Sequence, residues 1–213
     1  MKLTPHQVQS PKPLVPRAKN SQKQEPKKPD PVEQFFKSSI AAVGGGLGIY
    51  QASSAFAGTY LHEWGHKAAV GLLYQDTPVD IHVEPFKGGH IFAPKLGAPT
   101  ELGELLGMEG RRAAVHAAGT AMDALSSVAC MAAGYQIHKK MPFVGASLMG
   151  YAGYRMANSV LYAAGGIGKT PGSIPGHDFL NFEAMTGVPC WVQAVALASL
   201  LPLQFYLMRK ADS

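Results

Sequence analysis

The amino-acid sequence predicts an all-α polytopic membrane protein with about four transmembrane helices and a small membrane-associated β-hairpin after an early helix. Residues 38–61 form a run of 24, and residues 184–208 a run of 25, without a charged side chain. Both runs exceed the roughly 18 apolar residues that mark a candidate transmembrane helix. Residues 113–137 and 141–164 are equally apolar, with one charged residue each. Their many Ala, Gly and Ser residues are typical of membrane helices that pack closely together.

The N-terminal part of the chain differs from the rest in composition. Residues 1–37 hold eight Lys or Arg and three Asp or Glu, which accounts for the whole formal net charge of +5. A segment so poor in apolar residues cannot offset the entropy it loses on ordering. We therefore predict a disordered, basic, Pro-rich tail over residues 1–36 and a membrane domain over residues 37–213. Because the remaining charges balance at eleven of each sign, no basic face predicts a nucleic-acid partner.

The first apolar run continues past a cluster of ionisable residues to Tyr74. As one helix, residues 38–74 would be about 55 Å long, whereas the hydrocarbon core of a bilayer is about 30 Å thick. We therefore predict a break at the glycines of "GGGLG", residues 44–48, followed by a helix from about Leu47 to Tyr74.

Two further segments lie between this helix and the next apolar run. Residues 79–94, "VDIHVEPFKGGHIFAP", contain two short runs of β-type residues separated by "FKGG". This pattern predicts a β-hairpin. Residues 100–112, "TELGELLGMEGRR", predict an amphipathic turn or helix at the membrane interface.

The distribution of basic residues indicates an orientation. With four spans, the tail and the basic pairs at 139–140 and 209–210 fall on one side of the membrane. Since the cytoplasmic side carries the excess of Lys and Arg, this favours cytoplasmic N- and C-termini. Three basic residues fall on the opposite side: Arg111, Arg112 and Lys169.

The stretch "HEWGH", residues 62–66, supplies the chemistry. His62 and His66 are four residues apart, so on a helix they project from one face and can ligate a single ion. Glu63 is rotated by about 100 degrees from His62 and can reach a metal-bound water without binding the metal, as a general base must. An ionisable residue at membrane depth is costly and marks a candidate functional site. The alternative is a solvated helix on which Glu63 pairs with Lys67.

A catalytic zinc ion needs a third protein ligand and one open position. Asp178, in "GSIPGHDFLNF", is our first choice because the surrounding Pro and Gly residues form a loop that can reach back to the ion. His177 beside it is a lesser candidate. Asp123, within the second apolar cluster, is the rival acid.

These motifs, in this order, resemble the site-2 protease family of intramembrane zinc metalloproteases. "HEWGH" lies on an early membrane helix, "KGGHIFAP" is similar to the Gly-Gly strand of the family, and "AGTAMDAL" is similar to its small-residue helix. An aspartate-bearing loop then precedes the last span. The resemblance covers roughly residues 47–208. It implies zinc held by His62, His66 and Asp178, with Glu63 as the catalytic base.

The resemblance also implies that the hairpin binds the substrate. The chain differs from the family pattern at two places. The hairpin residues that would bind substrate are Gly88, Gly89, His90 and Ile91. Where the family has Leu-Asp-Gly, this chain has His177, Asp178 and Phe179. Where the family has a helix asparagine, this chain has Asp123, which is therefore a rival third ligand or a substrate-binding group. The alternative for Asp123 is a buried ion pair with Arg155.

The sequence thus predicts a zinc metalloprotease that cleaves a membrane-protein or peptide substrate in or near the lipid bilayer. A catalytically silent membrane scaffold of the same fold is the first alternative, and a soluble zincin is the second. A nucleotide is not expected, because "AAGGIGKT", residues 163–170, has alanine where a phosphate-binding loop needs its first glycine. Pro171 also follows where a helix should begin.

Overall fold

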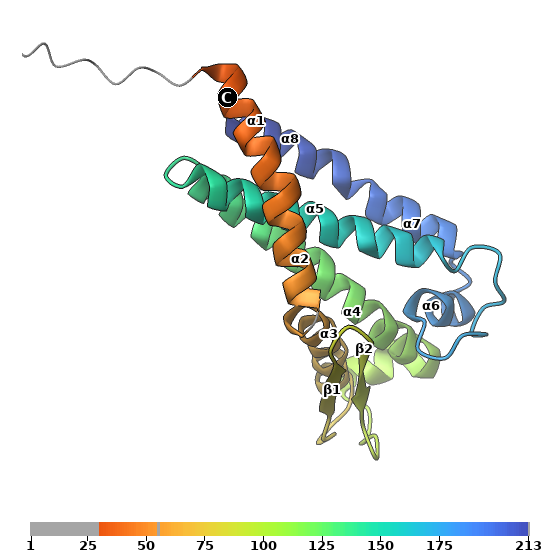
Figure 1. Ribbon diagram of the computed structural model, residues 1–213. Helices are drawn as coiled ribbons and strands as arrows, with labels where there is room; N and C mark the ends of the chain where they lie inside the picture. Colours follow the sequence, from red (N-terminus) through yellow and green to blue (C-terminus); the bar gives the residue numbers. More distant parts are fainter. Residues whose placement is uncertain (1–29, 55, 213) are drawn as a thin grey trace, which may run out of the picture.

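The computed structural model describes residues 30–54 and 56–212, and these residues are mostly helical with one small antiparallel sheet (Figure 1). The predicted helical class and the predicted hairpin are therefore confirmed. The elements in chain order are α1 (Pro31–Ile40), the π-helical turn η1 (Ala41–Gly45), α2 (Gly46–Ser54), α3 (Ala57–Leu73), β1 (Asp80–Glu84), β2 (Gly88–Phe92), α4 (Glu101–His138), α5 (Pro142–Ala164), α6 (Asp178–Thr186), α7 (Cys190–Ala198) and α8 (Leu200–Asp212).

Helix α1 begins earlier than the predicted domain boundary. The side chain of Asp30 accepts a hydrogen bond from the Val32 amide at 2.9 Å, which caps the first turn. Residues 31–36, assigned to the tail from the sequence, are therefore helical. The rest of that tail, residues 1–29, lies outside the described residues.

The break in the first apolar run lies downstream of the predicted position. The glycines at 44–46 stay helical because the chain passes them as a π-turn and enters α2 directly. A Cβ on Gly46 would lie 2.6 Å from the carbonyl carbon of Gly150, so this glycine allows α2 to pack closely against α5. The helix is interrupted near Phe56, whose φ of −150° and ψ of −65° are not helical. The predicted single helix from Leu47 to Tyr74 is therefore wrong, and α3 alone carries the two histidines.

Residues on either side of position 113 lie in the same helical segment of α4, which continues from the kink at Gly107 to His138. Thr100 caps α4 by accepting a hydrogen bond from the Gly103 amide at 3.1 Å. Gly107 has a φ of 67° and kinks the helix. The kink thus divides the predicted interfacial segment 100–112, and its second part continues into the predicted span 113–137. After the turn at residues 139–140, α5 returns along α4 (Figure 1).

The C-terminal region is more broken than the sequence indicates. Asp178 is the first residue of α6, not part of a loop, and α6 ends at Gly187, whose φ is 73°. The predicted single span 184–208 is therefore divided among α6, α7 and α8. Among the described residues, no individual helix has both the length and the apolar character to cross a membrane. One pair bent by 118°, α6 with Cys190–Gln204, meets these criteria when taken together.

The hairpin is positioned next to the first histidine helix. Its strands pair in antiparallel register, with Asp80 opposite Phe92 and Glu84 opposite Gly88. Buried Val70 and Leu73 of α3 pack in a cluster that includes Ile91. The sheet is therefore anchored to the helix that carries "HEWGH" (Figure 1).

Candidate metal centre

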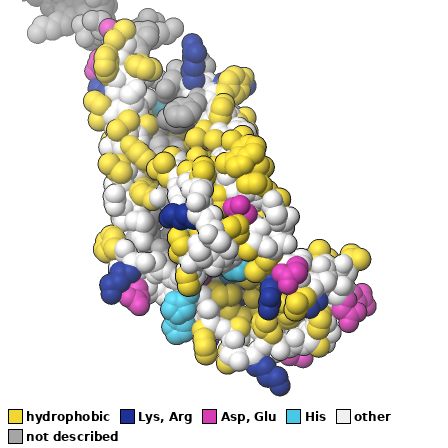
Figure 2. Space-filling model, turned by 90° about the vertical axis from the view of Figure 1, so that its right-hand side faces the viewer, with side chains coloured by type: hydrophobic (Ala, Val, Ile, Leu, Met, Phe, Trp, Pro, Cys, Tyr) yellow, Lys and Arg dark blue, Asp and Glu magenta, His cyan; other side chains and the backbone are white. Residues whose placement is uncertain are grey.

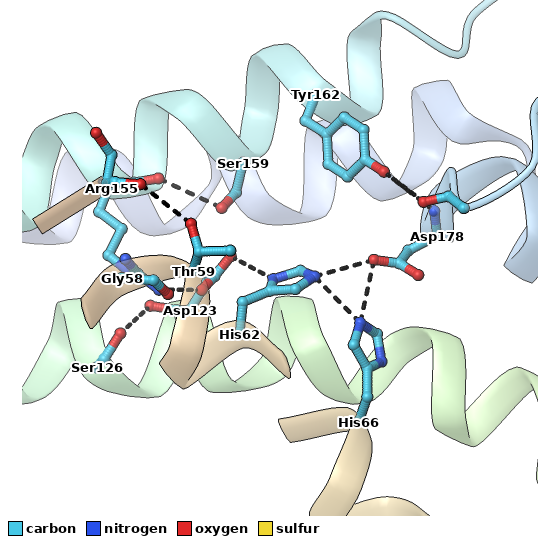
Figure 3. A network of polar contacts seen from close by, with 12 residues as sticks. Gly58, Thr59, His62, His66, Asp123, Ser126, Arg155, Ser159, Tyr162 and Asp178 are labelled. Carbon is cyan, nitrogen blue, oxygen red and sulfur yellow. Dashed lines mark hydrogen bonds and ion pairs between the residues drawn. The ribbon is translucent and has the colours of Figure 1, made fainter. Parts of the chain in front are cut away.

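Three side chains from two distant helices converge at one point (Figure 3). The Nε2 atoms of His62 and His66 are 3.1 Å apart, as their positions one turn apart on α3 allow. The Oδ2 atom of Asp178 is 3.1 Å from His62 Nε2 and 3.4 Å from His66 Nε2. The possible ligand atoms all lie within 4.8 Å of one another, so His62, His66 and Asp178 could together hold a metal ion.

Contacts at the N-terminus of α6 position Asp178. The Tyr162 hydroxyl donates to the Gly176 carbonyl at 3.1 Å and accepts a hydrogen bond from the Asp178 amide at 3.3 Å. The second carboxylate oxygen, Oδ1, is 3.2 Å from His116 Nδ1. Because Oδ1 is engaged by His116, Oδ2 remains directed at the two histidines of α3.

His177, the lesser candidate ligand, has a different role. Its Nδ1 accepts a hydrogen bond from the Leu180 amide at 3.4 Å and so caps α6. Its ring packs on Tyr162 with 4.4 Å between the ring centroids. Burial lowers the pKa of His177, which favours the neutral ring that capping requires.

Outer contacts direct both histidine rings toward the same point. His66 Nδ1 is 2.6 Å from the Val115 carbonyl oxygen, to which it donates, and His62 Nδ1 is 2.9 Å from Asp123 Oδ2. Such partners fix the tautomer and the orientation of a metal-binding imidazole. In each ring the opposite nitrogen, Nε2, is therefore the one available to an ion.

Asp123 lies on the far side of His62 from Asp178. It forms an ion pair with Arg155, and Arg155 also donates to the Gly58 carbonyl oxygen at 2.9 Å (Figure 3). The structure thus groups Asp178, and not Asp123, with the two Nε2 atoms. Asp123 makes the ion pair that the sequence left open and also contacts His62, which makes it a positioning residue for that ring.

Glu63 is buried beside the hairpin. Its exposed fraction is 5%, so it does not lie on the solvated face that the alternative interpretation required. A Cβ on Gly89 would lie 2.8 Å from Glu63 Cγ and 3.1 Å from Glu63 Oε1. Glycine at position 89 therefore lets β2 pass directly over this carboxylate.

A cavity of about 600 Å³ connects these groups. The three possible ligands line it, and so do Glu63, Asp123 and His116 and the hairpin residues from Lys87 to Ile91. Of the predicted substrate-binding residues, Gly88, Gly89, His90 and Ile91 thus lie on the cavity wall. The site combines a potential metal position, a carboxylate beside it and a strand along one side.

Sequence reasoning missed His116. Its position relative to Gly119 and Asp123 could have identified it, because residues three and seven apart share one face of a helix. That face of α4 is turned toward α3. His116, Gly119 and Asp123 all contact residues of the centre.

Gly119 keeps the metal position open, which leads to a first prediction. A Cβ on this residue would lie 2.6 Å from His62 Nε2 and would also contact His66 Nε2. We expect Gly119→Ala to weaken metal binding by at least about tenfold, since disturbing groups behind the ligands already costs 10–100-fold. Metal content after dialysis against buffered zinc measures this. Gly71→Ala is the matched control, because a Cβ on Gly71 of α3 would meet nothing within 4 Å. Wild-type affinity in Gly119→Ala would show that the ion does not sit between these rings.

Comparisons of the chain with protein-family models, with curated proteins and with solved structures found no match. The geometry of the site and the residues themselves are therefore the basis for a functional assignment.

Proposed function

We propose that this protein is an intramembrane zinc metalloprotease, similar in mechanism to the site-2 proteases. The observation that carries the proposal is the convergence of His62, His66 and Asp178 with Glu63 on the same cavity. Two imidazoles and one carboxylate, with space for water, match the donor set of a catalytic zinc site. The open space beside Gly119, which a Cβ would fill, also fits an ion at that point.

The chain's own residues would perform the proton transfers. When bound, zinc supplies a water of lowered pKa and polarises the carbonyl group of the peptide bond. Glu63 would accept the proton of the attacking water and deliver it to the leaving amine. Its burial against Gly89 holds the carboxylate in one place, which this double role requires.

The membrane setting is supported by the distribution of apolar side chains. Figure 2 shows apolar side chains along the upper half of the visible face, with charged side chains gathered near its lower and upper ends and a few between them. Large apolar residues are exposed along α1, η1 and α2: Phe35, Phe36, Ile40, Val43, Leu47 and Ile49. Interrupted helices are tolerated at membrane depth where they border a polar cavity. The proposal therefore includes a lipid bilayer as a partner and places both termini of the chain on the cytoplasmic side.

The direct test is hydrolysis by the purified full chain in detergent or vesicles. We expect cleavage of unfolded or transmembrane peptides to stop when a chelator removes the metal and to return when Zn²⁺ is added. A folded chain that binds zinc without turnover would favour the catalytically silent scaffold. Release of the protein from membranes at alkaline pH would favour the soluble zincin.

The hairpin offers a way to hold the substrate. A membrane helix must unwind before its scissile carbonyl can react, and the freed backbone groups then need partners. Strand β2 borders the cavity, and no further strand pairs with its outer edge among the described residues. An extended peptide could pair with that edge and pass over Glu63.

Proline substitutions test this strand pairing. Along an antiparallel strand, successive amides point alternately to the partner and to the open edge, so at least one of residues 90–92 presents an outward donor. We expect proline at His90, Ile91 or Phe92, tested in turn, to impair cleavage at one or more positions without releasing zinc. Proline at exposed Glu101, the first residue of α4, is the control, because a helix tolerates proline there. Unchanged cleavage in all three hairpin variants would rule out strand pairing.

A further inference from the structure

The hairpin carries a second pair of histidines, on the face turned away from α3. His82 of β1 and His90 of β2 are directly opposite each other in the antiparallel register. They are the exposed histidines among the described residues, whereas the other histidines are half-buried or buried. Figure 2 shows histidine side chains at the surface of the lower end of the molecule, next to charged groups of both signs.

The rings of His82 and His90 are stacked on each other. Their centroids are 5.3 Å apart and their planes are inclined by 16°. Nitrogens bound to one tetrahedral ion lie about 3.4 Å apart, given metal–nitrogen bonds of about 2.0–2.1 Å. Because directly opposite residues have Cβ atoms about 4.5–5.5 Å apart, rotation about the side-chain bonds of His82 and His90 allows one nitrogen of each ring to reach this separation.

The same face of the sheet also carries two carboxylates. Because side chains alternate between the two faces of a strand, Asp80 and Glu84 share the face of His82. Glu84 forms an ion pair with Lys87 at 3.0 Å and is partly engaged. Asp80 is exposed and lies opposite Phe92, one pair along from the histidines on that face. Two imidazoles with open water positions are suited to Zn²⁺, Ni²⁺ and Cu²⁺.

We propose that His82 and His90 form a second site for a divalent transition-metal ion, separate from the centre made by His62, His66 and Asp178. An ion bound there links β1 to β2 across the register and fixes the hairpin. His90 also lines the cavity, so the second site shares strand β2 with it. The proposal does not depend on protease activity, because it requires only the hairpin and its two histidines.

Copper binding to the tag-free full chain tests the proposal. The parent is the variant His62→Ala/His66→Ala, in which the first centre cannot compete, and zinc-loaded wild type is the second parent in case the double variant does not fold. In both parents we expect one Cu²⁺ whose electron paramagnetic resonance spectrum shows two nitrogen ligands. His82→Ala should weaken this binding by at least about tenfold, because even loss of a group behind a ligand costs 10–100-fold. His6→Ala, which removes a histidine elsewhere in the chain, should leave it unchanged.

Hydrogen exchange gives a second measurement that general copper binding would not affect. With Cu²⁺ bound, the amides of Asp80–Glu84 and Gly88–Phe92 should exchange more slowly in the parent and at the metal-free rate in His82→Ala. Equal affinity and an equal spectrum in parent and His82→Ala would overturn the proposal. So would the absence of a two-nitrogen site in both parents.

Discussion

Replacing Glu63 with glutamine is expected to abolish peptide hydrolysis while zinc stays bound. The amide side chain has the size of the carboxylate, so its packing against Gly89 is retained, but it cannot accept the proton of the attacking water. General-base catalysis is worth about 10²–10⁴-fold, and a loss of at least about 100-fold is therefore expected. Hydrolysis is measured as the initial rate of cleavage, and bound zinc as the metal content of the same preparation.

A surface glutamate provides the matched control for this substitution. Glu109 is half exposed and pairs with Arg112 at 3.8 Å, away from the centre. Glu109→Gln should retain both activity and zinc. Retained activity in Glu63→Gln would refute its role as general base. Joint loss of zinc and activity would instead assign Glu63 a structural part in the metal site.

Removal of Asp178 is expected to have the largest effect on metal binding. Asp178→Ala deletes the oxygen that faces both Nε2 atoms, so zinc affinity should fall by more than the roughly 10–100-fold seen when outer groups are lost. Asp123→Asn removes only the charge behind His62 and should cost no more than about 10–100-fold. Zinc titration against a competing chelator measures both variants. The reverse order of effects would make Asp123 the ligand.

The Asp123 variant needs a folding measurement beside it. Arg155 is buried at 7% exposure and forms its ion pair with Asp123. Breaking a buried pair by removing one partner costs about 3–5 kcal/mol, because the remaining charge is left uncompensated. Affinities should therefore be expressed per folded chain, with folding followed by circular dichroism.

Several features of the centre could be predicted because they are local in sequence. His62 and His66 are four residues apart, and helical geometry alone places them on one face. The hairpin follows from β-type residues on both sides of "FKGG", and its register agrees with that turn. Glu63 follows from its place next to His62. In each case the determining contacts lie within one element or one turn.

Other features depended on how the helices pack. The break near Phe56 was misplaced because the glycines at 44–46 serve close packing against α5 and not interruption of the helix. The arrangement of α4 was missed because the break falls at Gly107, inside the predicted interfacial segment, and residues 108–138 then continue as one helix. Composition records that small residues are present, but not whether they break a helix or let another backbone approach.

The sequence by itself determined the pair of histidines, the neighbouring glutamate and the hairpin, since their spacing is converted into geometry by the period of a helix or a strand. Only the tertiary structure decided between Asp178 and Asp123, because they lie 116 and 61 residues from His62. The path of the segment before α6, held by Tyr162 and His116, brings Asp178 to the Nε2 side of that ring, whereas the packing of α4 brings Asp123 to the Nδ1 side. No periodicity encodes such a choice, because it follows from where separate helices come to rest against one another.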